Sequence, residues 1–318
     1  MSQRILIVGD SPLSYFIARL IDAELSRLAH MQVTHITTDT DLVYFPTIST
    51  VLGPAVFRRK KLENVVLKKE TVMSINLKAK RVVTNREVYS YDYLILDLMP
   101  VITVQEFLAI QRSAKEVVVH LQAALKQNEK LNATVNFAGD IFGCQLALAL
   151  ARDRTKLSSR TMRKLAINVT KTNSTFLDSF LASNDISLGC SKSPGFNVGQ
   201  ARAQLSWKKI KVLTVDGAGH ALTLPSLNLE KFQEVFVLDA VNLLSSLWRS
   251  QWVVAKQVEK NIVSTLERKP LRVIDGMPAP KYLTGDNGQI LLWGGIESRR
   301  LRASAVGALD RAFVRRIS

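Results

Sequence analysis

The sequence predicts an α/β protein with two Rossmann-like dinucleotide-binding domains, the second inserted in the first, followed by an amphipathic helix at the C-terminus. The main observation is that a buried strand, a turn and a helix follow one another twice, at residues 5–14 and 133–143. Such a unit opens a dinucleotide-binding domain. A further buried strand, at residues 235–239, lies far beyond the second unit. We therefore expect one domain at 1–110 and 225–275, a second at 111–224, and a C-terminal segment at 276–318.

The spacing of apolar residues predicts the elements in order along the chain. The first domain is expected to have strands at residues 4–8, 32–37, 65–72, 74–77, 80–84 and 91–96, with a helix at 13–28. The second is expected to have helices at 101–128 and 144–151, and strands starting at Ala133 and at 166–170, 186–188, 203–207 and 211–215. A strand at 235–239 and a long helix at 243–268 then complete the first domain.

Composition narrows the class of protein. The chain has 318 residues, of which 47% are hydrophobic, and this is enough for a core in each of two domains. Its two cysteines and four histidines lack the spacing of a disulfide framework, a metal site or a catalytic triad. No signal segment is recognised, and no apolar run approaches the roughly 20 residues of a membrane span. We therefore expect a cytoplasmic protein without a metal.

Positive charge is the unusual feature of the composition. The net charge is +16, and the cations cluster at residues 58–61, 152–164 and 299–316. Such clusters favour an anionic partner, although a solvated basic surface without any partner explains them as well. Aromatic residues do not alternate with these cations, so nucleic acid is not the expected partner.

Both turns have lost glycines that a dinucleotide needs. The fingerprint Gly-x-Gly-x-x-Gly lets the backbone turn tightly, approach the pyrophosphate and pack a helix on the strand. The first turn has Gly9, Ser11 and Ser14 at these positions, and the second has Ala138, Asp140 and Gly143. Asp140 stands at the position of the second glycine, where its negative charge repels the phosphates of a dinucleotide. Asp10 and Ser11 also suit a simpler role, as caps of the helix that begins near Pro12.

Several segments, in order along the chain, resemble the two-dinucleotide-binding flavoproteins of the pyridine nucleotide-disulfide oxidoreductase superfamily, and type II NADH dehydrogenases most of all. They are the first turn at Gly9, the following strand that ends at Thr37, the apolar segment ending in Pro46, the strand that leads into Asp97, the turn at 143–147 and the strand that ends at Asp239. The resemblance covers nearly the whole chain. It implies an FAD-binding domain and an NAD(P)H-binding domain.

The resemblance also implies positions for two cofactor sites. It assigns Gly9, Ser11, Ser14, Thr37, Asp39, Pro46, Asp97 and Asp239 to an FAD-like site, and Gly139, Gly143 and Gln145 to an NADH-like site. Some of these residues depart from the family pattern. Thr37 stands where the family has an acidic residue that binds the adenosine ribose, and the nearby Asp39 is a substitute for that residue. Asp97 is the first residue of the segment that replaces Ala-Thr-Gly beside the flavin. Gln145 replaces a glutamate near the nicotinamide. No catalytic residue is assigned.

Two functions are consistent with these departures. The first is a type II NADH dehydrogenase-like protein with degraded FAD and NADH motifs, which is cofactor-poor or inactive and serves as a binding or scaffold subunit. The second is an active FAD-dependent NADH:quinone oxidoreductase that transfers hydride from NADH to FAD and electrons to quinone. We favour the first, because replacing glycines at a pyrophosphate turn removes the physical means of binding.

The C-terminal segment at residues 298–318 has apolar residues at helical spacing and six arginines, so it is expected to be a basic amphipathic helix. In type II NADH dehydrogenases this region lies on the membrane. The helix is therefore a candidate for binding an anionic surface on the inner face of a membrane. Packing against the domain, a protein partner or a second copy of the chain is the alternative.

Overall fold

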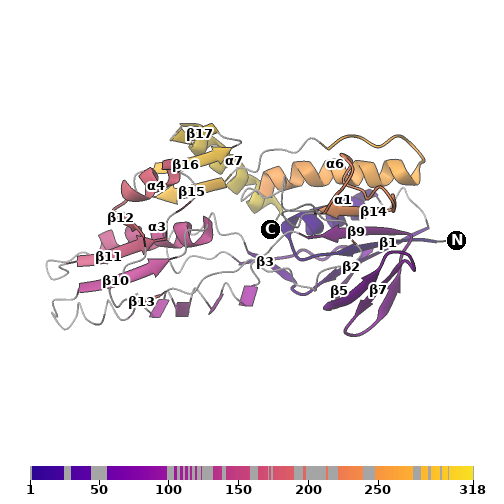
Figure 1. Ribbon diagram of the computed structural model, residues 1–318, viewed down its shortest axis with the longest axis horizontal. Coiled ribbons are helices and arrows are strands. Elements are labelled where there is room, and N and C mark those ends of the chain that lie inside the picture. The colour runs from indigo at the N-terminus through magenta and orange to yellow at the C-terminus, as the bar shows by residue number, and fades with distance from the viewer. Residues whose placement is uncertain are drawn as a thin grey trace.

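The computed structural model has two lobes, each built around a parallel sheet, with the N-terminus in one of them (Figure 1). It describes residues 2–24, 30–43, 56–98, 132–137, 141–157, 164–170, 172, 175–189, 196–197, 213, 221–238, 248–274, 281–285, 288–293, 296–299 and 301–317, and short helical stretches between 104 and 123. These last fall in the predicted helix at 101–128.

The N-terminal lobe contains a five-stranded parallel sheet in the order β14-β9-β1-β2-β5. Its strands are β1 (Gln3–Val8), β2 (Met31–Thr37), β5 (Val65–Lys69), β9 (Tyr93–Asp97) and β14 (Val235–Leu238). The strands expected at 4–8, 32–37, 91–96 and 235–239 are thus confirmed to within two residues. The central strands are buried apolar runs, as expected of a parallel sheet that is covered on both faces.

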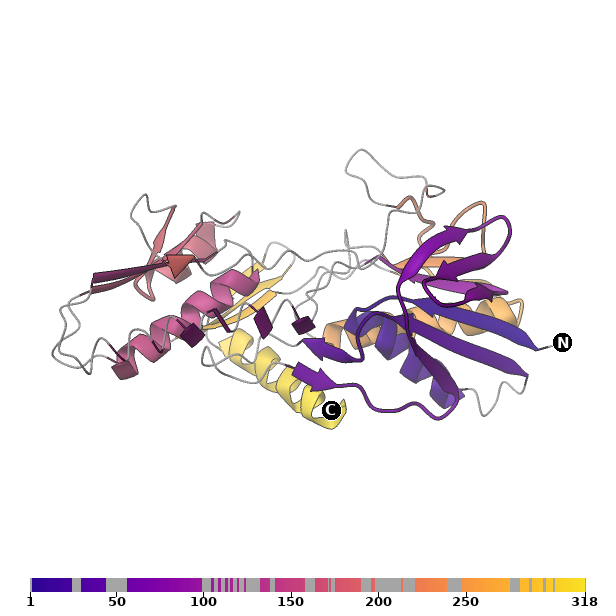
Figure 2. The ribbon, with the colours of Figure 1, turned by 90° about the horizontal axis from the view of Figure 1, so that it is seen from below.

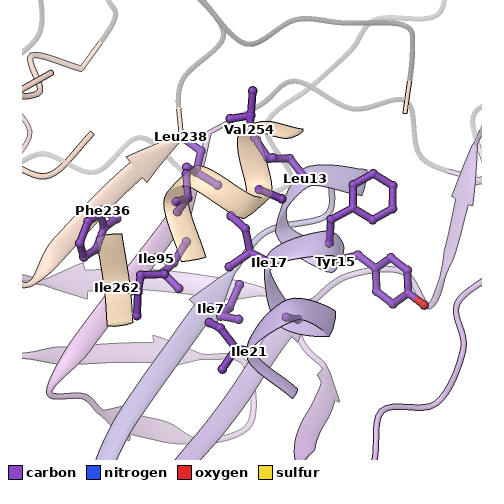
Figure 3. Close-up of a cluster of buried hydrophobic side chains, with 14 of the residues drawn as sticks. Ile7, Leu13, Tyr15, Ile17, Ile21, Ile95, Phe236, Leu238, Val254 and Ile262 are labelled. Atoms are coloured by element: carbon purple, nitrogen blue, oxygen red, sulfur yellow. The ribbon is translucent and has the colours of Figure 1, made fainter. Parts of the chain in front are cut away.

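Two helices cover one face of this sheet, α1 (Pro12–Glu24) and α6 (Trp248–Leu266). Leu13 and Ile17 of α1 lie with Val254 and Ile262 of α6 over Ile7 of β1, within one cluster of buried side chains (Figure 3). The opposite face is covered by an antiparallel sheet of β6 (Val72–Asn76), β7 (Arg81–Thr84) and β8 (Val88–Ser90). The predicted helices at 13–28 and 243–268 are longer than α1 and α6, and residues 25–29 and 243–247 lie outside the described residues.

The second lobe contains a four-stranded parallel sheet in the order β12-β11-β10-β13. Its strands are β10 (Asn132–Phe137), β11 (Lys164–Val169), β12 (Ile186–Leu188) and β13 (Phe196–Asn197), with helices α3 (Ile141–Leu157) and α4 (Thr175–Ala182). The strands predicted at 203–207 and 211–215 fall outside the described residues, apart from Leu213.

The order of strands along the chain shows how the two sheets are related. All strands of the second sheet come after β9 and before β14, and β14 pairs with β9 in the first sheet. The second Rossmann-like unit is therefore inserted in the first, as the sequence predicts. The exact domain limits at residues 110, 224 and 275 stay predictions.

The C-terminal segment begins with strands that the sequence analysis did not predict. β15 (Lys281–Gly285), β16 (Gly288–Trp293) and β17 (Ile296–Arg299) form an antiparallel sheet, and α7 (Leu301–Ile317) follows. The expected amphipathic helix is confirmed, but Ser298 and Arg299 belong to β17 because they pair with Leu291 and Ile290 of β16. Within the described part of the chain, no helix is both long and apolar enough to span a membrane.

Candidate functional site

The first turn joins the carboxyl end of β1 to the N-terminus of α1. The Ser11 hydroxyl accepts a hydrogen bond from the Leu13 amide at 3.1 Å, and the Ser14 hydroxyl donates to the Ser11 carbonyl at 2.9 Å. Both side chains are buried. Ser11 therefore caps the helix, as the sequence predicts, because its oxygen satisfies an amide that has no partner within the first helical turn.

Asp97 occupies the anion-binding side of this turn. It is the last residue of β9, and its Oδ2 atom accepts hydrogen bonds from the Ser11 amide at 3.1 Å and from the Ser11 hydroxyl at 2.5 Å. Only 2% of Asp97 is exposed. The N-terminus of a helix attracts negative charge through its free amides and its dipole. Here the carboxylate of the same chain supplies that charge.

Gly9 lies directly against Asp97. A Cβ atom placed on Gly9 would lie 2.2 Å from the Asp97 Cβ and 2.7 Å from its Oδ2. In a dinucleotide-binding turn the first glycine, at the position of Gly9, permits the tight turn, and the second, at the position of Ser11, lets the backbone approach the pyrophosphate. In this chain the Asp97 side chain fills the space beside Gly9, so the glycine fits its own aspartate. This arrangement does not fit a pyrophosphate in the same place, since two anions would compete for one set of donors.

Asp10 joins the first turn to the end of β2. Its Oδ1 atom accepts hydrogen bonds from the Thr37 hydroxyl at 2.6 Å and from the Thr38 amide at 2.5 Å. Asp39 accepts from the Val104 amide at 3.3 Å through Oδ2. Thr37 and Asp39, both assigned to the ribose end of the FAD-like site, therefore lie next to the first turn, and Thr37 is bonded to Asp10.

Arg59 is a site residue that the sequence analysis missed. It lies in the basic run at residues 58–61, yet it is only 8% exposed, and its guanidinium lies 5.6 Å from the centre of the Tyr15 ring. Nη2 donates to the Asp10 carbonyl at 3.1 Å, whereas Nε and Nη1 have no hydrogen-bond partner in the described part of the chain. Burial lowers the pKa of Arg59, and the negative charges of Asp10 and Asp39 oppose that effect. Nothing in a run of four basic residues reveals which one is buried.

His35 is the second residue that was missed. It lies on β2, is fully buried, and its Nε2 atom lies 2.9 Å from the Gly9 carbonyl oxygen, to which it donates. Burial lowers the pKa of His35 to about 3, and the positive charge of Arg59 acts in the same direction. The folded protein therefore keeps this imidazole neutral.

This burial predicts an acid-sensitive stability. An unfolded histidine has a pKa of about 6.5, so between that pH and about 3 the unfolded chain binds a proton that the folded chain does not. The free energy of unfolding should therefore fall as the pH falls, and His35 should contribute a loss of about 2 kcal/mol between pH 6.5 and 5. Urea titrations at the two pH values measure the loss. In His35→Gln, the loss of unfolding free energy between the two pH values should be smaller than in wild type by about 2 kcal/mol. In His30→Asn, which alters an exposed histidine, the loss should equal that of wild type. An equal loss in wild type and His35→Gln would contradict the prediction.

The second turn is described only in part. Gly143 and Gln145 lie in the first turns of α3, and both are buried, Gln145 completely. Gly139 lies outside the described residues, as do Pro46 and Asp239 of the FAD-like site. The structure thus brings together Gly9, Ser11, Ser14, Thr37, Asp39 and Asp97 at the first turn. Among the described residues, no group of three His, Cys, Asp or Glu side chains is arranged to hold a metal ion.

Comparison with known proteins gives matches in structure alone. No protein-family model matches the sequence, and no curated protein matches it. Among solved structures, the sulfide:quinone oxidoreductase of Aquifex aeolicus superposes with a TM-score of 0.73 at 12% identity, over 99% of this chain and 91% of that one. NDH2 of Plasmodium falciparum in complex with NADH superposes with a TM-score of 0.65 at 10% identity, over 100% and 95%.

A third similar structure is a chain of an assembly. It belongs to the cryo-EM structure of the mitochondrial ATP synthase of Tetrahymena thermophila, with a TM-score of 0.68 and 10% identity, over 98% of this chain and 93% of that one. At such low identities the likeness concerns the fold. The resemblance noted in the sequence is confirmed at that level, and the chain has the fold of the two-dinucleotide-binding flavoproteins.

Proposed function

We propose that this chain is a cofactor-free protein of the type II NADH dehydrogenase fold that serves as a binding or scaffold subunit. The observation that carries the proposal is the carboxylate of Asp97 on the Ser11 amide and hydroxyl. A protein that binds FAD through this turn needs those donors for the pyrophosphate. An aspartate there competes with the phosphate for the donors and repels it.

The neighbourhood of the turn supports the same proposal. Asp10 adds a second carboxylate beside the turn, and the one buried cation described there, Arg59, donates to a backbone carbonyl. The nearest charge to the donors of the turn is thus the negative charge of Asp97. Binding FAD in the family's way would require the Asp97 side chain to leave a buried position against Gly9. The turn is therefore better suited to hold the fold together than to exchange a cofactor.

A similar solved structure also supports a structural role. A chain of the same fold is found in the structure of a mitochondrial ATP synthase, so this fold occurs within a large assembly. The alternative is an active FAD-dependent NADH:quinone oxidoreductase, and two neighbours of the same fold are a sulfide:quinone oxidoreductase and NDH2. The state of the cofactor distinguishes the two functions.

The direct test is the absorbance of the purified protein between 300 and 550 nm, followed by fluorescence of the supernatant after heat denaturation. We expect no flavin bands, no released FAD, and no change of the spectrum of added FAD. Flavin bands that release free FAD would overturn the proposal and support the oxidoreductase.

The contribution of Asp97 is tested by restoring the turn. Ser11→Gly with Ser14→Gly leaves the carboxylate in place, so this double variant should stay without FAD. Addition of Asp97→Gly should allow FAD to bind, and binding changes the fluorescence of the flavin. Equilibrium titration with FAD measures both. Binding by the double variant alone would show that Asp97 does not close the turn.

We further propose that the chain works in the cytoplasmic compartment and meets its partner through the C-terminal segment at residues 298–318, which contains the helix α7 (Leu301–Ile317). An anionic membrane surface and a protein partner are the two candidates for this helix. The packing of α7 favours the protein partner.

A further inference from the structure

We propose that the outer face of α7, together with the basic segment at residues 58–61, is a docking surface for an acidic amphipathic helix of a partner protein. The inference rests on the proposed scaffold function and names the chemistry of its partner. It depends on the described side chains of two segments that are far apart in the sequence.

The first observation is a group of cations without partners. On these two segments, five exposed cations have no carboxylate within salt-bridge distance among the described residues: Arg58, Lys60, Lys61, Arg315 and Arg316. Other exposed cations of the N-terminal lobe differ from one another, since Arg4 and Lys80 have carboxylate partners, whereas Lys78 and Arg81 have none among the described residues. The unpaired group therefore leaves its positive charge available to another molecule.

The second observation is that the fold brings the segment at residues 58–61 and the C-terminal end of α7 to the same side of the molecule. The Lys60 amide donates to the Tyr15 hydroxyl at 3.1 Å. The Tyr15 ring lies 5.9 Å from the Phe16 ring, and Phe16 lies 6.1 Å from Phe313 of α7. The hairpin of β3 (Asp41–Val43) and β4 (Val56–Arg58) accordingly lies beside the C-terminal end of α7 in both views (Figures 1 and 2).

The third observation concerns the apolar residues of α7. The bulky side chains Phe313 and Val314 pack into the core cluster, so they are used within the chain. The outer face has exposed residues at i, i+3, i+4 and i+7, namely Ala305, Ala308, Leu309 and Ala312, and Leu309 is 53% exposed. Small side chains let a second helix approach closely, at an axial distance of about 8 Å. A membrane would gain little from three alanines and one leucine, because interfacial binding depends on buried apolar area.

These observations together indicate which kind of partner fits the docking surface. A helix that carries leucine-sized side chains on one face can pack on the stripe around Leu309. Acidic residues beside that face would then lie near Arg315 and Arg316 and near the segment at 58–61. Opposite charges fix the orientation and exclude other partners more than they add affinity. An acidic amphipathic helix satisfies both requirements.

The test uses the full chain and a labelled synthetic helix of about five turns, with leucines on one face and glutamates on the other. Fluorescence anisotropy at physiological salt should show binding. Leu309→Glu should weaken it about tenfold or more, and so should Arg315→Glu with Arg316→Glu, or Lys60→Glu with Lys61→Glu. Lys78→Glu with Arg81→Glu makes the same change of charge at exposed positions outside this surface, and this control should stay within about twofold of wild type.

Three results would overturn the inference. They are an equal loss in the control, full binding by Leu309→Glu, or equal binding of a peptide in which lysines replace the glutamates. Vesicles of phosphatidylcholine with about one third phosphatidylserine test the other candidate. Binding to these vesicles that depends on Leu309 and on Arg315 and Arg316, without binding of the peptide, would assign the surface to a membrane instead. None of these results depends on the presence of flavin. The flavin spectrum therefore tests the scaffold function, and the binding experiments test its partner independently.

Discussion

Gly9→Ala should destabilise the protein by about 3 kcal/mol, because overpacking a rigid core costs that order of free energy. The added methyl group would lie 2.2 Å from the Asp97 Cβ, and neither atom is the end of a flexible side chain. Gly9 lies at the end of the buried strand β1, and Asp97 ends β9, which pairs with β1. A shift at either position would disturb the centre of the sheet. Urea unfolding of the two proteins measures the loss.

The cause is isolated by a double-mutant cycle. Asp97→Gly removes the Cβ that the new methyl group would meet, so Gly9→Ala should cost about 2 kcal/mol less in that background. Gly189→Ala is the matched control. Gly189 has a φ of +114°, but nothing lies within 4 Å of an added Cβ, so only the backbone penalty of about 1–2 kcal/mol applies. That penalty should be independent of Asp97. A cost of Gly9→Ala that is also independent of Asp97 would contradict the close approach of the two residues.

The pair Gly9–Asp97 explains why a glycine stands at the first position of the turn, whereas serines stand at the other two positions of the fingerprint. A glycine at this position is required by whatever lies against it, and here that is an aspartate of the same chain. The positions of Ser11 and Ser14 are under no such constraint, and their hydroxyls bond to the turn itself. The turn is thus held in shape by hydrogen bonds to its own serines and to a carboxylate of the same chain.

The sequence predicts the scaffold of this protein better than its site. Buried parallel strands such as residues 4–8 and 235–239 are recognisable because both faces of such a strand are apolar. The three strands β15 to β17 were missed, since short antiparallel strands have a weaker pattern than helices. At the site, the resemblance placed Asp97 near the flavin, but not its bond to Ser11, which links residues 86 positions apart. The burial of Arg59 and His35 depends on contacts of the same long-range kind.

Phe16→Ala should cost about 4 kcal/mol, the usual range for a fully buried phenylalanine. Phe16 of α1 is completely buried and holds three elements together. Its ring lies 5.5 Å from Trp252 of α6 and 6.1 Å from Phe313 of α7, both at steep angles, and edge-to-face pairs of this kind add to the effect of buried area. Loss of this ring leaves a cavity between α1, α6 and α7. Calorimetry or urea unfolding measures the cost.

The same substitution should also loosen α7 against the N-terminal lobe, because Phe313 loses one of its two aromatic neighbours and keeps only Trp252, at 5.7 Å. Trypsin cleavage at Arg311, Arg315 and Arg316 should then be faster under native conditions. Leu309→Ala changes the exposed face of the same helix, so it should alter stability by less than about 0.5 kcal/mol and leave cleavage unchanged. A destabilised Phe16→Ala protein with unchanged cleavage would mean that the remaining contacts of α7, with Trp252 of α6 and with β16 and β17, suffice to hold the helix. In that case the position of α7 beside the segment at 58–61 would not depend on the Phe16 ring.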